Sequence, residues 1–70
     1  MSTLVTLTVN GEPHDLPAGL SVAALLARLG IAGGRVAVEV NEDVVPRGTW
    51  ESHGLAAGDR VEIVQFVGGG

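Results

Sequence analysis

Apolar and polar residues alternate at the start of the chain, which is the pattern of a half-buried strand. Over residues 4–9, Val5, Leu7 and Val9 share one face, and Thr6 and Thr8 share the other. Asn10-Gly11 follows, and both residue types tolerate the positive φ angles of a tight hairpin turn. We therefore predict a hairpin whose second strand covers residues 12–16. Pro13 lacks a backbone N–H, so this second strand should lie at a sheet edge.

The spacing of apolar residues then changes to that of a helix. Val22, Leu25, Leu26 and Leu29 recur on one face of a predicted helix over residues 22–29. Ser21 is placed to cap its N-terminus, and Gly30 is placed to end it. A helix this short is not stable alone, so it must pack on a sheet.

Alternation returns in the second half of the chain. After a Gly33-Gly34 turn, Val36, Val38 and Val40 share one face of a strand over residues 35–41. A strand of two or three residues is expected at 44–46, then a loop or single helical turn over 47–54 with Trp50 as its anchor. A turn at 57–60 leads into the last strand, residues 61–67.

These elements predict an α+β fold with one main helix across one face of a mixed four- to five-stranded sheet. The last strand is nearly continuously apolar, so we place it centrally and parallel to the first. This arrangement is the β-grasp, or ubiquitin-like, architecture. We assign residues 1–67 to one domain and residues 68–70 to a flexible C-terminal glycine tail.

Composition narrows the functions open to this domain. The 70 residues contain no Cys, which excludes Cys-based zinc sites, redox motifs and cysteine nucleophiles. The net charge of −4, without a single Lys, disfavours nucleic acid and favours a basic protein surface as partner. We see no secretory signal and no apolar run that could span a bilayer, so we expect a cytoplasmic protein that does not bind membranes.

Candidate catalytic groups are few and scattered. His14 and His53 have no partner Cys or Ser-Asp arrangement, and we assign both to surface or loop positions. Glu42-Asp43 and Glu51 are better explained as solvated turn residues than as an acid–base pair. Gly33-Gly34 is a turn and lacks the pattern of a phosphate loop. We expect no catalytic residue, no metal site and no bound cofactor.

The end of the chain offers a different kind of site. If Val61 and Ile63 face the helix, Val64 and Phe66 face the open side of the sheet, where exposed apolar residues often mark contact sites. Alternatively, a bulge near Gln65 turns Phe66 into the core, and the sequence does not decide between these two possibilities. Phe66 lies two residues before the glycine tail, Gly68, Gly69 and Gly70. Residues without Cβ atoms can thread closely through another protein's active site.

One segment resembles a known family closely. Residues 38–50 match the V-x-V-N-x-x-x-V-P-R-x-x-W stretch of ThiS, the sulfur carriers of thiamine biosynthesis. The turn at residues 55–59, the opening Val9-Asn10-Gly11-Glu12 and the Gly-Gly end match too, so the resemblance covers nearly the whole chain. A third glycine, Gly68, precedes the usual final pair.

The resemblance implies a protein that is modified by enzymes and is not itself one. A ThiF-type enzyme would adenylate the Gly70 carboxylate, a sulfur-donating enzyme would lead to a thiocarboxylate, and thiazole synthase (ThiG) would take the sulfur. Gly68 and Gly69 would provide clearance for threading, and Val64 and Phe66 would belong to the docking surface. We expect the free protein to be a monomer.

Two other functions fit the same fold. The first is a MoaD-like small subunit of molybdopterin synthase, which the Val45-Pro46-Arg47 and Trp50 combination disfavours. The second is a non-covalent ubiquitin-like interaction module or a protein tag. A module of this kind would not need Gly70 to function.

Overall fold

The computed structural model describes residues 3–31 and 34–66. Strands β1 (Leu4–Val9) and β2 (Glu12–Pro17) form the predicted hairpin, paired from Leu4 opposite Pro17 to Val9 opposite Glu12. The turn has φ angles of 50° at Asn10 and 83° at Gly11, so both residues take the left-handed conformation that a tight hairpin needs. β2 is an edge strand, as predicted.

Helix α1 (Val22–Arg28) begins and ends as predicted, to within one residue. The Ser21 hydroxyl accepts a hydrogen bond from the Ala24 backbone N–H at 3.0 Å and so caps the N-terminus. Leu29 is the C-cap, and Gly30 follows with a φ of 72°. The helix buries Val22, Leu25 and Leu26 against the sheet, which supplies the packing that so short a helix requires.

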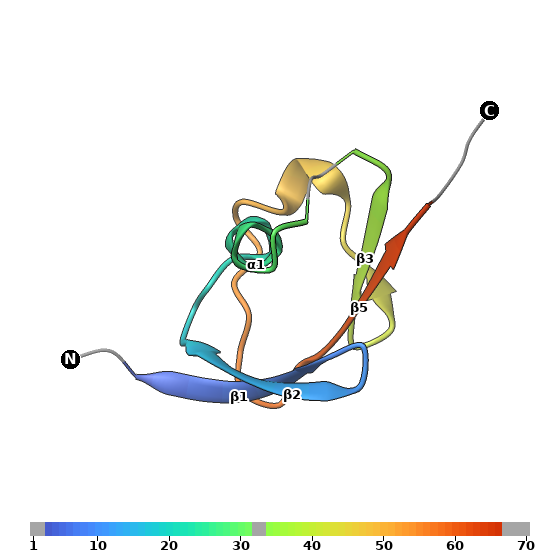
Figure 1. The fold of residues 1–70 in the computed structure, drawn as a ribbon. Coiled ribbons are helices and arrows are strands. Elements are labelled where there is room, and N and C mark those ends of the chain that lie inside the picture. The colour runs from blue at the N-terminus through green and yellow to red at the C-terminus, as the bar shows by residue number, and fades with distance from the viewer. Residues whose placement is uncertain (1–2, 32–33, 67–70) are drawn as a thin grey trace.

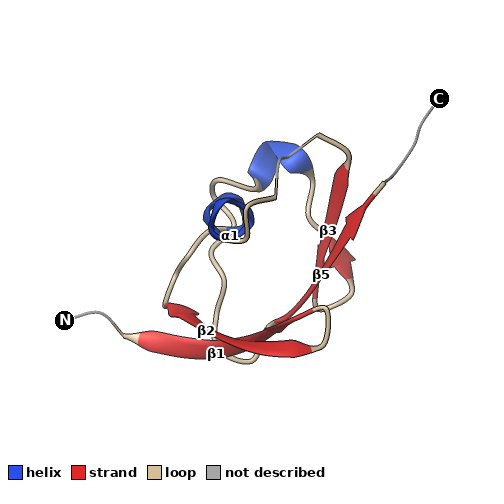
Figure 2. Cartoon of the chain, viewed as in Figure 1, coloured by secondary structure: helices blue, strands red, loops and turns tan. Residues whose placement is uncertain are grey.

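The sheet contains five strands in the order β2-β1-β5-β3-β4, which confirms the β-grasp prediction. β3 (Val36–Val40) and β5 (Arg60–Gln65) are antiparallel, whereas β5 runs parallel to β1 and lies between β1 and β3. In Figures 1 and 2 the β1–β2 and β3–β5 pairs diverge, and α1 lies in the angle between them. Among the described residues, no helix covers the face of the sheet opposite α1 (Figure 1).

Strand β4 (Asp43–Val44) lies slightly earlier than the predicted strand at 44–46. Val45 is buried, and its N–H donates to the Val38 carbonyl at 2.8 Å, so the chain turns into the core there. The short 3₁₀ helix η1 (Arg47–Thr49) follows, within the segment predicted as a loop or single helical turn. β5 likewise starts and ends earlier than predicted, and Val67 is outside the described residues.

A single core lies between α1 and the sheet. Trp50 is buried in it, and its Nε1–H donates to the Val45 carbonyl at 2.9 Å, which confirms the packing role expected from the sequence. Fourteen residues form this core: Leu7, Val9, Leu16, Val22, Leu25, Leu26, Val36, Val38, Val40, Val45, Trp50, Leu55, Val61 and Ile63. Among residues 3–31 and 34–66, no helix combines the length and apolarity needed to cross a membrane.

Candidate functional site on the outer face of the sheet

Strand β5 separates its apolar side chains between the two faces of the sheet. Val61 and Ile63 are buried beneath α1, whereas Val64 is 51% exposed and Phe66 is 57% exposed. The Phe66 N–H donates to the Arg35 carbonyl at 2.8 Å, one step beyond the pairing of Gln65 with Val36. The register with β3 therefore continues through Phe66. The interpretation in which a bulge turns Phe66 into the core is wrong.

A third exposed apolar side chain belongs to the same face. Val44 is 66% exposed and lies opposite Glu39 in the β3–β4 pair, while Val64 lies opposite Ala37 in the β3–β5 pair. Glu39 and Ala37 both point away from the core, because Val36, Val38 and Val40 take the alternate positions. We call Val44, Val64 and Phe66 the outer-face patch.

Val44 was missed from the sequence because residues 43–46 hold too few residues to show an alternation. The signal that marks it is the burial of Val45, which places Val44 on the opposite face.

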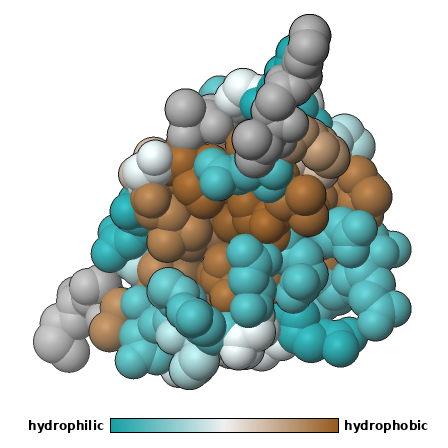
Figure 3. Space-filling model, turned by 45° about the vertical axis from the view of Figure 1, so that its right-hand side comes forward, coloured by the Kyte–Doolittle hydropathy of each residue, from teal (hydrophilic) through white to brown (hydrophobic). Residues whose placement is uncertain are grey.

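Seen in space-filling form, hydrophobic residues gather in the middle of one face of the molecule and hydrophilic residues lie below them (Figure 3). Gly68, Gly69 and Gly70 lie outside the described residues, and the chain reaches them two residues after Phe66.

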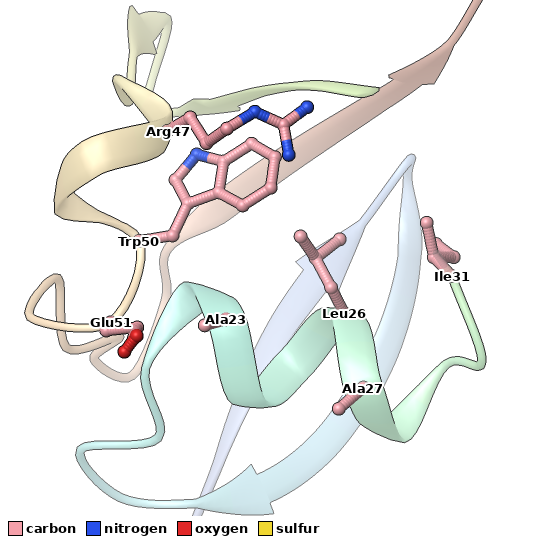
Figure 4. Close-up of a pocket in the computed structure, with 7 residues that line it drawn as sticks. All are labelled: Ala23, Leu26, Ala27, Ile31, Arg47, Trp50 and Glu51. Carbon is pink, nitrogen blue, oxygen red and sulfur yellow. The ribbon is translucent and has the colours of Figure 1, made fainter. Parts of the chain in front are cut away.

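A second feature is an open hollow of about 360 Å³ between α1 and η1 (Figure 4). Arg47 covers the Trp50 ring, with its guanidinium carbon 4.6 Å from the ring centroid. An Nη of Arg47 also donates to the Gly34 carbonyl at 2.7 Å. Arg47 thus ties η1 to the turn before β3, a contact that sequence reasoning did not foresee. Seven residues line the hollow: Ala23, Leu26, Ala27, Ile31, Arg47, Trp50 and Glu51.

The hollow does not bring together the groups that catalysis needs. Arg47 and Glu51 are its only charged lining residues, and no nucleophile accompanies them. His14 lies on β2 and His53 in the loop after η1, both partly buried. Glu42 pairs at 3.7 Å with Arg60 on the solvated surface. Within residues 3–31 and 34–66, no three His, Asp or Glu side chains gather as metal ligands would.

The comparisons with known proteins point to one family. The model of the ThiS family matches residues 7–70, a stretch that includes the glycine end. A crystal structure of a thiamine biosynthesis protein (ThiS) from Geobacter metallireducens has a TM-score of 0.81 and 38% identity, and the match covers 94% of this chain and 100% of that one.

Curated relatives fall into two size classes. The sulfur carrier protein ThiS of Escherichia coli is 31% identical over 61 residues, which cover 87% of this chain and 92% of that protein. A thiazole synthase from Magnetococcus marinus is 48% identical over 62 residues, which cover 89% of this chain but only 19% of the synthase. The chain thus spans about a fifth of the length of the thiazole synthases that it matches. With the family model, the fold and a full-length relative in agreement, this chain belongs to the ThiS family.

Proposed function

We propose that this chain is a sulfur carrier of thiamine biosynthesis that works through the carboxylate of Gly70. The observation that carries the proposal is the match of the ThiS family model, which extends through the terminal glycines. In this proposal residues 1–67 form the domain that partner enzymes hold, and residues 68–70 are the flexible tail that they modify. The protein is a co-substrate of those enzymes and catalyses no step itself.

The chemistry begins with activation of the carboxylate. An α-carboxylate is ionised at pH 7 and is a poor electrophile. In the proposed first step a Gly70 oxygen attacks the α-phosphate of ATP in a ThiF-type enzyme, pyrophosphate leaves, and an acyl adenylate forms. Sulfur delivered by a sulfur-donating enzyme at the oxidation level of hydrosulfide then attacks the acyl carbon of the adenylate, the bond to AMP breaks, and a C-terminal thiocarboxylate forms. Gly68 and Gly69 let the tail enter a narrow active site because they carry no Cβ atoms.

Thiazole synthase (ThiG) is the proposed acceptor of the sulfur. Two relatives named thiazole synthase contain a region similar to this chain within a much longer polypeptide. Joining a carrier to its acceptor in one chain raises their effective concentration. This arrangement supports a carrier–synthase encounter for the present chain as well.

The outer-face patch is the proposed docking surface. Val64 and Phe66 are exposed, and Phe66 precedes the glycine tail by two residues in sequence, so a partner that binds them is positioned to receive Gly70. Val44 enlarges the same surface. The ATP and any metal ion would be held by the partner enzyme.

Deletion of Gly69 and Gly70 together tests this function in cells, because loss of Gly70 alone would leave Gly68-Gly69 as another Gly-Gly end. Cells that lack their own ThiS protein should grow without added thiamine when they receive the wild-type chain and fail to grow when they receive the deletion variant. A Glu12→Gln variant, altered far from Gly70 in sequence, is the control that an expressed variant can function, and it should support growth. Growth with the deletion variant would overturn the proposal, because a non-covalent module does not need its last residues and a carrier does.

A further inference from the structure

Two glutamates lie directly opposite each other on the face of the sheet that carries the outer-face patch. Glu39 on β3 pairs with Glu62 on β5, and on its other side Glu39 pairs with Val44 on β4. The next residue pair along the strands on this face is Ala37 opposite Val64. Val44, Glu39 and Glu62 therefore lie in one row across β4, β3 and β5, and Val64 follows Glu62 on the same face. Both glutamates are exposed.

This arrangement is unfavourable in the free protein. Like charges directly opposite each other on neighbouring strands destabilise a sheet. The nearest cation along β5 is Arg60, two residues before Glu62 on the same face, but Arg60 pairs with Glu42 at 3.7 Å. Within the described part of the chain, neither Glu39 nor Glu62 has an ion-pair partner.

A protein that covers the patch must also cover these carboxylates. Removing charged groups from water is costly unless an opposite charge replaces the lost hydration. A guanidinium presents several N–H donors in one plane and can bond two carboxylates at once, so it suits this site well. The apolar residues alone would fit many partners, whereas the glutamate pair demands a cation at one defined position.

We propose that the adenylating enzyme docks on this face with an arginine side chain held between Glu39 and Glu62. The inference rests on the proposed function and adds the chemistry of the docking surface. Docking replaces the repulsion between the two glutamates by two charge-assisted hydrogen bonds. Glu39 and Glu62 are thus specificity residues for the partner, retained at a cost to the stability of the free domain.

The test compares two double variants of the full chain. Glu39→Gln/Glu62→Gln removes both charges at nearly constant shape, and Glu12→Gln/Glu51→Gln makes the same change in net charge at exposed positions outside the patch. The association rate with the cognate adenylating enzyme is measured over a series of salt concentrations. At low salt we expect the patch variant to associate roughly threefold to tenfold more slowly, with a weaker salt dependence, and the control to resemble wild type.

Thermal unfolding provides an independent readout. Relief of the like-charge repulsion should raise the melting temperature of the patch variant by about 1–6 °C. The inference is overturned if the patch variant associates at the wild-type rate or if both double variants show the same decrease in association rate. It is also overturned if the melting temperature of the patch variant does not rise. An enzyme that fails to adenylate even the wild-type chain would instead overturn the proposed function.

Discussion

At the scale of single residues, β5 shows how one strand can serve both the core and a surface. Val61 and Ile63 complete the core, while Val64 and Phe66 are left half or more exposed. More than half of the Phe66 side chain stays in water, so it contributes less to folding than a fully buried Phe would. In the proposed function, Phe66 belongs to the surface that a partner contacts.

Phe66→Ala should therefore weaken docking and leave the fold almost unchanged. We expect the free energy of unfolding to change by less than about 0.5 kcal/mol. The Kd for the adenylating enzyme should rise about tenfold, as is typical when an aromatic interface residue is truncated. Leu4→Ala is the matched control, because Leu4 is 61% exposed on β1 and lies outside the patch. Equal Kd values for the Phe66→Ala and wild-type chains would remove Phe66 from the docking surface.

Gly69 tests the clearance assigned to the tail. Gly69→Leu adds a branched side chain next to the reacting residue, and misplacement of a reacting group by about 1 Å can cost about a hundredfold in rate. We expect the rate of adenylation of Gly70 to fall about a hundredfold while the melting temperature of the chain stays the same. Gly48→Leu is the control, since a Cβ at Gly48 meets nothing within 4 Å. Adenylation of Gly69→Leu at the wild-type rate would contradict the clearance argument.

At the scale of elements, the joint between β1 and β5 is short, and the side chain of Asn10 extends it. Only Thr8 with Arg60 and Val9 with Val61 are paired as strand residues. The Asn10 side chain then continues the ladder. Its Oδ1 accepts from the Ile63 N–H at 2.7 Å, and its Nδ2 donates to the Ile63 carbonyl at 3.2 Å. Asn10 thus forms the hairpin turn and also fixes the central strand that carries the patch.

Asn10→Gly isolates the contribution of this side chain, because glycine keeps the positive φ of 50° without strain. Loss of both bonds leaves the Ile63 backbone groups without their partner and should lower the free energy of unfolding by about 1–3 kcal/mol. Chemical denaturation measures this change. Glu42→Gly is the control, since Glu42 also has a positive φ, of 74°, but forms only an exposed ion pair. Equal stability of Asn10→Gly and wild type would show that the backbone pairs alone hold the joint.

At the scale of the whole molecule, local signals in the sequence were sufficient for most of the fold. Asn10-Gly11, Ser21 and Gly30 act within a few residues of their own positions, so their turn and cap roles were predictable. The exposure of Phe66 was not, because it depends on the register between β5 and β3, which are distant in sequence. The packing of Arg47 on Trp50 and the glutamate pair likewise arise only when separate segments meet. The glycine tail could be proposed from the sequence alone, and its role stays a prediction.

The described residues form one body with an apolar and acidic outer face, and β5 leads in sequence toward the terminal glycines. Its hollow and its histidines provide no assembled catalytic group among the described residues. A folded domain separate from the reacting end suits a protein that acts as a co-substrate of two enzymes. Each enzyme can bind the same domain and act on the same C-terminus. In the proposed function, the chemical change is confined to Gly70.

The most direct test of this account is the intact mass of the chain after incubation with ATP, the cognate adenylating enzyme and a sulfur source. The account predicts a mass gain equal to the replacement of one oxygen by sulfur, located at Gly70 by fragmentation and absent when ATP is omitted. An unchanged mass with an enzyme that is active on its own carrier, or a sulfur located elsewhere in the chain, would contradict it.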